Sequence, residues 1–296
     1  MKRTTILSLL LLMAASIMAQ SVKIAPKMKK GDVKTYTGTG EASVQNQMVR
    51  TSQDIVISVT DKTKNGFVVQ VENQKGEAKT DINFANLTQV LNKVFANQTS
   101  IYETNKDGKI TLVKNLEEQR QYAVSMIDEI FNNAQMKQMN VILPRENIMK
   151  MVEEKFTQEN ALKMALCLPS PLALNGKTIS EGMEEESINA QGLKMRTIYH
   201  LNNGGKTIVA TSNLDMNVEE VKAYLVKQVK QLMPSLASMF EGQIDQALQR
   251  GTVKVSATQK AIYEIGDDGW VRQLTVNSES AQTGQVNKSN IVYTLK

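Results

Sequence analysis

The sequence predicts an α+β fold: a curved, half-barrel-like antiparallel β-sheet with amphipathic helices packed on one face. The first observation is a series of short runs rich in β-branched residues, separated by Asn-Gly and Asp-Gly pairs, the pattern of antiparallel hairpins. The second is a set of longer stretches in which apolar residues recur at three- and four-residue steps, the pattern of helices that cover a sheet. Strands and helices occupy separate stretches, which is typical of α+β folds and not of alternating parallel ones.

One short motif occurs twice. Residues 101–110 read Ile-Tyr-Glu-Thr-Asn-Lys-Asp-Gly-Lys-Ile, and residues 262–271 read Ile-Tyr-Glu-Ile-Gly-Asp-Asp-Gly-Trp-Val. In each copy Asp-Gly lies between apolar alternations, and Gly supplies the positive φ that a tight turn needs. Each copy therefore predicts a hairpin. The pair indicates an internal duplication or, alternatively, two unrelated turns of a β-rich protein.

The first 20 residues have the features of a secretory signal peptide. Lys2 and Arg3 precede an almost unbroken apolar run over 6–13, and small residues lead to Ala19 and Gln20. The run is too short for a membrane span, so we expect cleavage and a periplasmic or secreted protein, with an uncleaved anchor as the alternative. No cysteine follows the run directly, so we expect no lipid anchor.

The first half of the mature chain, residues 21–168, is predicted to begin with three antiparallel strands over 33–72. An Asn-Gly pair at 65–66 marks the turn between the last two strands. A short helix is expected over 86–96, ahead of the first Asp-Gly hairpin. Longer helices are expected over 115–168, because apolar residues recur there at helical spacing.

A segment with two prolines and an Asn-Gly pair, residues 169–176, is predicted to link the halves. The second half, residues 177–296, repeats the order of the first: weakly alternating strands, a long amphipathic helix, the second Asp-Gly hairpin and a last strand. The helix is expected over 218–248, kinked or divided at Pro234. A single curved sheet is the prediction, and two smaller sheet-plus-helix domains are the alternative.

Composition excludes several classes of function. The formal net charge of +5 is spread along the chain and aromatic residues make up only 5%, so no nucleic-acid surface is expected. No later apolar run approaches the ~20 residues of a transmembrane helix. Cys167 lies in an apolar context and is expected to be a core residue, with an intermolecular disulfide as the alternative.

The sequence offers few groups for catalysis, so we expect neither an enzyme nor a cofactor or metal site. His200 lies at a predicted strand end, and neither a Gly-x-Ser-x-Gly motif nor a cluster of metal ligands is present. Glu103 and Glu264 are equivalent in the repeat and are expected to face solvent or pair across their hairpins. The aspartates of the two turns lack calcium-loop spacing, and a turn role accounts for them.

Methionine is the unusual component, since thirteen of the sixteen methionines follow residue 20. Its flexible, polarizable side chain suits promiscuous apolar binding, and ordinary core packing is the alternative. Helices that line the concave side of a curved sheet would enclose an apolar cavity. The candidate cavity-lining residues are Met126, Ile130, Met151, Met233, Met239 and Phe240.

Three segments resemble uncharacterised exported proteins of Gram-negative bacteria. They are the Met18-Ala19-Gln20 end of the signal peptide, the Lys30-Gly31-Asp32-x-x-x-Tyr36 opening, and the hairpin over 105–110. The order of strands and helices is also similar to that of periplasmic lipoprotein-carrier half-barrels. These resemblances imply an exported protein.

We therefore predict a non-catalytic exported binding protein that holds a lipid or other apolar ligand between sheet and helices. One alternative is a structural or envelope-interaction protein that acts through its surface on an envelope protein partner. The other is a hydrolase, which would need two carboxylates about 5 to 10 Å apart in one cleft.

Overall fold

The computed structural model describes residues 21–44, 47–74, 76–80, 99–132, 144–167, 169–188, 192–232, 237–250, 255–282 and 285–296. The predicted signal peptide over 1–20 and the predicted helix over 86–96 lie outside these ranges. Within them, no helix is both long enough and apolar enough to cross a membrane.

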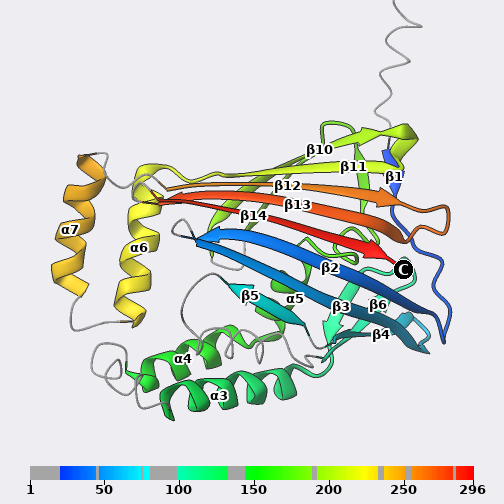
Figure 1. The fold of residues 1–296 in the computed structure, drawn as a ribbon, viewed down its shortest axis with the longest axis horizontal. Helices are drawn as coiled ribbons and strands as arrows, with labels where there is room; N and C mark the ends of the chain where they lie inside the picture. Colours follow the sequence, from blue (N-terminus) through cyan, green and yellow to red (C-terminus); the bar gives the residue numbers. More distant parts are fainter. Residues whose placement is uncertain are drawn as a thin grey trace, which may run out of the picture.

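Twelve of the described strands form one antiparallel sheet that runs through both halves of the chain (Figure 1). They are β2 (Val33–Val44), β3 (Gln47–Lys62), β4 (Gly66–Asn73), β5 (Glu77–Thr80), β6 (Thr99–Asn105), β7 (Ile110–Val113), β9 (Glu184–Ile188), β10 (Lys194–Asn202), β11 (Thr207–Leu214), β12 (Val255–Ile265), β13 (Val271–Gln282) and β14 (Gln285–Leu295). Their order is β7-β6-β4-β3-β2-β14-β13-β12-β11-β10-β9, and β5 pairs with β3 beside this path. The halves join where β14 pairs with β2, so they share a single sheet. The predicted α+β class and curved antiparallel sheet are confirmed.

The two copies of the Ile-Tyr-Glu motif form hairpins, as predicted, and the hairpins share a conformation. The β6–β7 ladder shifts register directly after Glu103, and the β12–β13 ladder shifts directly after Glu264, the equivalent position. Gly108 and Gly269 both adopt positive φ, +82° and +79°. The motif therefore specifies the same bulged turn twice.

Five α-helices are described, in addition to a 3₁₀ turn over Asn203–Gly205. They are α3 (Leu116–Asn132), α4 (Arg145–Lys155), α5 (Gln158–Cys167), α6 (Val218–Leu232) and α7 (Ala237–Gln249). In Figure 1, α6 and α7 stand side by side at one end of the sheet, α3 lies along α4, and α5 lies behind the strands. Helix α5 contacts both β7 and β9, which are the two terminal strands of the sheet path. Because one short helix reaches both edges, the sheet curves around α5. The face of the sheet that α5 covers is therefore its concave face.

Local signals set the helix boundaries. Helix α6 begins with a capping box, in which the Glu220 N–H donates to Asn217 Oδ1 (2.9 Å) and the Asn217 N–H donates to Glu220 Oε2 (3.0 Å). Helix α4 begins directly after Pro144, which cannot donate a backbone hydrogen bond. The Thr157 hydroxyl accepts from the Asn160 N–H at the start of α5 (3.3 Å).

The concave face carries the core. Along β10 every second residue is buried, namely Met195, Thr197, Tyr199 and Leu201, so one face packs and the other meets solvent. One cluster of buried residues covers the second-half strands and includes Leu274, and another covers the first-half strands and includes Tyr36. Trp270, from the second Asp-Gly turn, lies in the first-half cluster, so the two halves share a packed interior.

Both Asp-Gly turns close on the same N-terminal segment, residues 24–28. A Cβ on Gly269 would lie 2.8 Å from the Ala25 carbonyl oxygen, and one on Gly108 would lie 3.0 Å from Met28 Cε. At Gly269, where the neighbouring atoms belong to the backbone, only glycine allows both the positive φ and this close approach. Residues 24–28 therefore pack against both turns and cover this end of the half-barrel. We call this segment the plug.

The segment 169–176 joins α5 to β8 (Thr178–Ser180), which pairs with β1 (Ser21–Lys23) in a separate two-stranded sheet. The Ile24 N–H donates to the Lys177 carbonyl (2.9 Å), and the Gly176 N–H donates to the Ile24 carbonyl (2.6 Å). Leu172 is 5% exposed and Asn175 only 2%. The segment predicted to be a linker is thus packed into the core.

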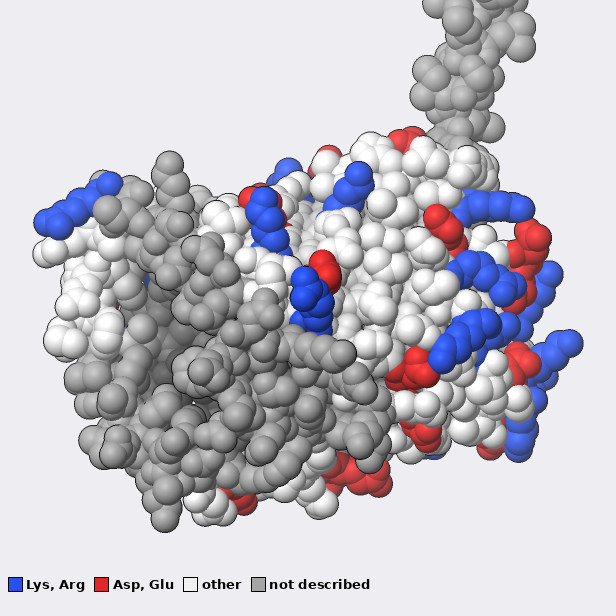
Figure 2. Space-filling model, in the orientation of Figure 1, with Lys and Arg blue, Asp and Glu red and all other residues white. Residues whose placement is uncertain are grey.

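Charged side chains of both signs are intermixed at the end of the molecule that carries the two Asp-Gly turns, on the right in Figure 2. The ion pairs of this end include Lys30–Asp61 (2.8 Å), Lys206–Asp267 (2.8 Å) and Lys296–Asp54 (2.7 Å). Such exposed pairs contribute little to stability. This end presents paired charges and not a surface of one sign.

Candidate functional site

A cavity of about 540 Å³ lies on the concave face, between strands β9–β12 on one side and α5 with the segment 169–177 on the other. Its strand residues include Met195, Thr197, Tyr199, Ala210 and Tyr263, and its helix residues are Lys163 and Leu166. The wall is therefore built from both the sheet and the covering elements.

The register of the strands explains why space remains here. Tyr199 pairs with Ala210, and Ala210 pairs with Ala261, so one cross-strand row carries two adjacent methyl groups. In the next row, Ile208 and Tyr263 are neighbours and fill the same layer. Two small side chains in the middle of a curved sheet thus leave a shallow gap in the cavity wall, and both alanines remain more than 90% buried.

On the other side of the Ala210–Ala261 row, the neighbouring row is polar. Thr197 pairs with Ser212, and Ser212 with Gln259. The Thr197 and Ser212 hydroxyls are hydrogen-bonded at 2.7 Å, and Gln259 Nε2 donates to the Ser278 hydroxyl (3.2 Å). The cavity thus passes from an apolar end near Leu174 and Tyr263 to a hydroxyl- and amide-bearing end.

A three-residue cluster occupies one wall. Lys177 Nζ donates to both carboxylate oxygens of Glu185 (3.0 and 2.7 Å), and the Tyr199 hydroxyl donates to the same carboxylate (2.6 Å). Burial alone would raise the pKa of Glu185, but the hydrogen bonds from Lys177 and Tyr199 outweigh burial and lower it. Glu185 is therefore held as a carboxylate.

A carboxylate held ionised in this way cannot serve as the general acid of a glycosidase pair. A glycosidase pair needs one carboxylic acid with a raised pKa, whereas the pKa of Glu185 is lowered. The other acidic residues of the wall, Glu186 and Asp215, lie 3.9 and 3.0 Å from Arg196. Among the described residues, no three metal-ligating side chains cluster together.

The side chains singled out in the sequence lie elsewhere. Met126 on α3 and Phe240 on α7 are half-buried, Met239 is 53% exposed, and none of these three lines the cavity. Ile130 and Met151 lie within α3 and α4, but their side chains, like Met233 as a whole, fall outside the described residues. A ligand-binding role for the six stays a prediction.

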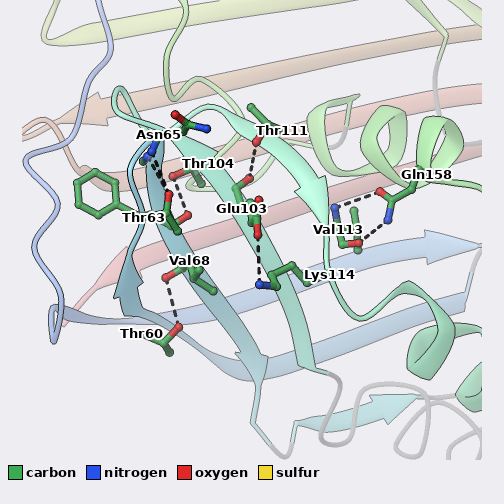
Figure 3. A network of polar contacts seen from close by, with 12 residues as sticks. Thr60, Thr63, Asn65, Val68, Glu103, Thr104, Thr111, Val113, Lys114 and Gln158 are labelled. Carbon is green, nitrogen blue, oxygen red and sulfur yellow. Dashed lines mark hydrogen bonds and ion pairs between the residues drawn. The ribbon is translucent and has the colours of Figure 1, made fainter.

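Other predicted residues have structural partners. Glu103 pairs with Lys114 (3.2 Å) across its hairpin (Figure 3). His200 is more than half exposed, and its Nδ1 lies 2.7 Å from Glu181 Oε1. Sequence reasoning missed Ala210, Ala261 and the Lys177–Glu185–Tyr199 cluster, because these residues meet only through strand register.

No family model and no curated protein matches the chain. Among solved structures, the chain is similar to one described as "Lipid-protein interactions in lipovitellin", with 7% identity and a TM-score of 0.43. The match covers 90% of this chain and 25% of that one, so the chain spans a quarter of that structure. A similarity of this degree identifies neither a family nor a ligand.

Proposed function

We propose that this chain is a non-catalytic, exported binding protein that holds a lipid or other apolar ligand in the cavity between β9–β12 and α5. The observation that carries the proposal is the cavity on the concave face, with the Ala210–Ala261 gap in its wall. The cavity volume, about 540 Å³, lies within the range of small-molecule sites. Its apolar wall with a few placed polar groups is also typical of such sites.

Access at the seam between α5 and β9 fits this role. On the β7 side, α5 is tied down by Gln158, whose amide bonds both the N–H (3.2 Å) and the carbonyl of Val113 (Figure 3). On the β9 side, cavity-lining residues of α5 face those of β9 across the opening. Apolar Ile188 of β9, which lines the cavity, is 48% exposed there. An apolar ligand would meet a matching surface at this seam.

The proposal is tested by filling the cavity. Binding of the neutral fluorophore N-phenylnaphthylamine to the mature chain is measured by titration, for wild type and for Ala261→Phe. We expect the variant to bind at least about tenfold more weakly, which corresponds to about 1.4 kcal/mol. Thr258→Phe is the matched control, because Thr258 lies on the same strand but is exposed on the opposite face.

Overpacking can cost about 1–3 kcal/mol of stability, so both variants are checked by urea unfolding. Ala210→Leu is the milder second variant if Ala261→Phe fails to fold. A folded variant that binds the fluorophore as wild type does would refute the cavity as the site. Lipid extraction and native mass spectrometry of protein purified from an envelope fraction then test for a natural ligand, and an apo mass would shift attention to surface partners.

A further inference from the structure

The cavity wall carries seven charged residues, and each of its acids lies near a cation. Four are lysines (Lys109, Lys163, Lys177 and Lys194) and three are acidic (Glu185, Glu186 and Asp215). Lys177 pairs with Glu185 at 2.7 Å. Arg196, which is not part of the wall, lies within 4.0 Å of both other acids. Each acidic side chain of the wall therefore has a cationic neighbour, and Arg196 is shared with Glu184 as well (4.0 Å).

The lysines are less fully engaged. Lys194 pairs with Glu220, outside the wall. Lys163 pairs with Glu159 (2.6 Å) one turn earlier on α5, but Glu159 is 76% exposed, and such pairs contribute little. Lys109 forms no ion pair with any side chain in the described part of the chain. Lys109 thus has no direct ion-pair partner among the described residues, and Lys163 is engaged only by an exposed pair.

A buried donor lies beside Lys109. Asn175 is 2% exposed and lines the cavity, and its Nδ2 has no acceptor among the described residues. This nitrogen would lie 3.3 Å from a Cβ on Gly108, the neighbour of Lys109, and Lys109 itself packs against Gly176. Buried polar groups without a partner are rare, and this amide, packed beside the Gly108 turn, can donate to an acceptor that enters the corner.

We propose that the ligand is an amphiphile with an oxyanion head group, carboxylate or phosphate, held by Lys109, Lys163 and the Asn175 amide. Its chain runs along the Ala210–Ala261 gap toward Tyr263. This inference rests on the proposed function and names the ligand class of the same cavity. Lysine binds either oxyanion as a point charge, so the two head groups share one recognition chemistry.

The test compares ligands that share one chain and differ only in the head group. Dodecanoate, dodecyl phosphate, dodecanol and dodecylamine displace N-phenylnaphthylamine from the mature chain. We expect one or both anions to bind at least about tenfold more tightly than dodecanol at low ionic strength, and dodecylamine to bind no better than dodecanol. The advantage should shrink with added salt, because the lysines are near the surface.

Substitutions test which residues make the anions bind more tightly than dodecanol. Lys109→Gln with Lys163→Gln should reduce the preference for the anions over dodecanol to within about threefold. Lys64→Gln is the matched control, an exposed lysine in the β3–β4 turn. Asn175→Ala should weaken the anions by about three- to tenfold.

The outcomes separate this inference from the proposed function. Dodecanol or dodecylamine binding as tightly as the anions overturns the oxyanion head group but leaves the cavity as a binding site. Failure of the fluorophore and all four compounds to bind overturns both. A preference retained in the double lysine variant overturns the assignment to Lys109 and Lys163. The stronger of the two anions identifies the head group as carboxylate or phosphate.

Discussion

The hydroxyl of Tyr36 donates a 2.7 Å hydrogen bond to the main-chain carbonyl of Val271, although 235 positions separate the two residues. Tyr36 lies on β2 and Val271 begins β13, and β14 runs between these strands. The tyrosine is fully buried, and burial raises the pKa of its hydroxyl, so it stays a neutral donor. One side chain thus connects the opening strand of the first half to the Asp-Gly hairpin of the second.

Tyr36→Phe tests this connection. The variant keeps the ring but leaves the Val271 carbonyl without its donor, and a buried unsatisfied group costs about 1–3 kcal/mol. We expect the free energy of unfolding in urea to fall by that amount. Tyr293→Phe is the control, because Tyr293 also packs in the core but its hydroxyl has no hydrogen bond to any described group. Equal losses in the two variants would contradict the prediction.

Gly269→Ala tests the plug formed by residues 24–28. Alanine at φ +79° costs about 1–2 kcal/mol, and its Cβ would in addition press on the Ala25 carbonyl oxygen at 2.8 Å. Gly182 has a similar φ of +70° with no atom within 4 Å of the added Cβ, so Gly182→Ala isolates the backbone term. We expect Gly269→Ala to lower the unfolding midpoint clearly more than Gly182→Ala. Equal unfolding midpoints in the two variants would show that residues 24–28 move aside without loss of stability.

Gln158→Leu tests the anchor of α5. The Gln158 amide bonds both backbone groups of Val113, as a neighbouring strand would, and so completes the open edge of β7. Leucine and glutamine have similar helix propensities, so the loss, about 1–2 kcal/mol, reports the edge bonds. Gln243→Leu on the exposed face of α7 is the control and should be within about 0.5 kcal/mol of wild type. Hydrogen exchange of the Val113 amide should rise in Gln158→Leu alone.

The sequence predicts the hairpins well because their turns carry their own geometry. Asp-Gly and Asn-Gly demand tight turns wherever they lie, so β3–β4, β6–β7 and β12–β13 could be located without tertiary information. The edge bonds of Gln158 could not be predicted, since nothing at a helix start shows which strand it will meet. The burial of residues 169–176 was missed for the same reason, because prolines and Asn-Gly indicate a turn but not what covers it.

The cavity is harder to predict from the sequence than the hairpins are. Ala210 and Ala261 are 51 positions apart, and only the pairing of β11 with β12 makes their methyl groups neighbours. A one-residue slip in that register would turn one of the two alanines away from the cavity. Methionine-rich helices drew the prediction toward α3, α4 and α7, whereas the wall of the described cavity comes from strands and from α5.

The last prediction concerns how the stability of the fold depends on pH. The pKa of Glu185 is lowered from its ordinary value of 4.5, because hydrogen bonds from Lys177 and Tyr199 outweigh the effect of burial. A carboxylate with a depressed pKa stabilises the fold above that ordinary value, and the stabilisation is lost as the pH falls through the lowered pKa. The Glu185 side chain is 36% exposed, so solvent screening keeps the contribution below about 1 kcal/mol.

Glu185→Gln should therefore be less stable than wild type near neutral pH and approach it as the pH falls below 4.5. Urea unfolding of both proteins across this interval measures the difference, and other carboxylates cancel because both proteins carry them. Tyr199→Phe, which removes one of the two donors, should show a smaller change of the same sign. A stability difference that stays constant across the interval would mean that the Lys177–Glu185–Tyr199 cluster is not what depresses the Glu185 pKa.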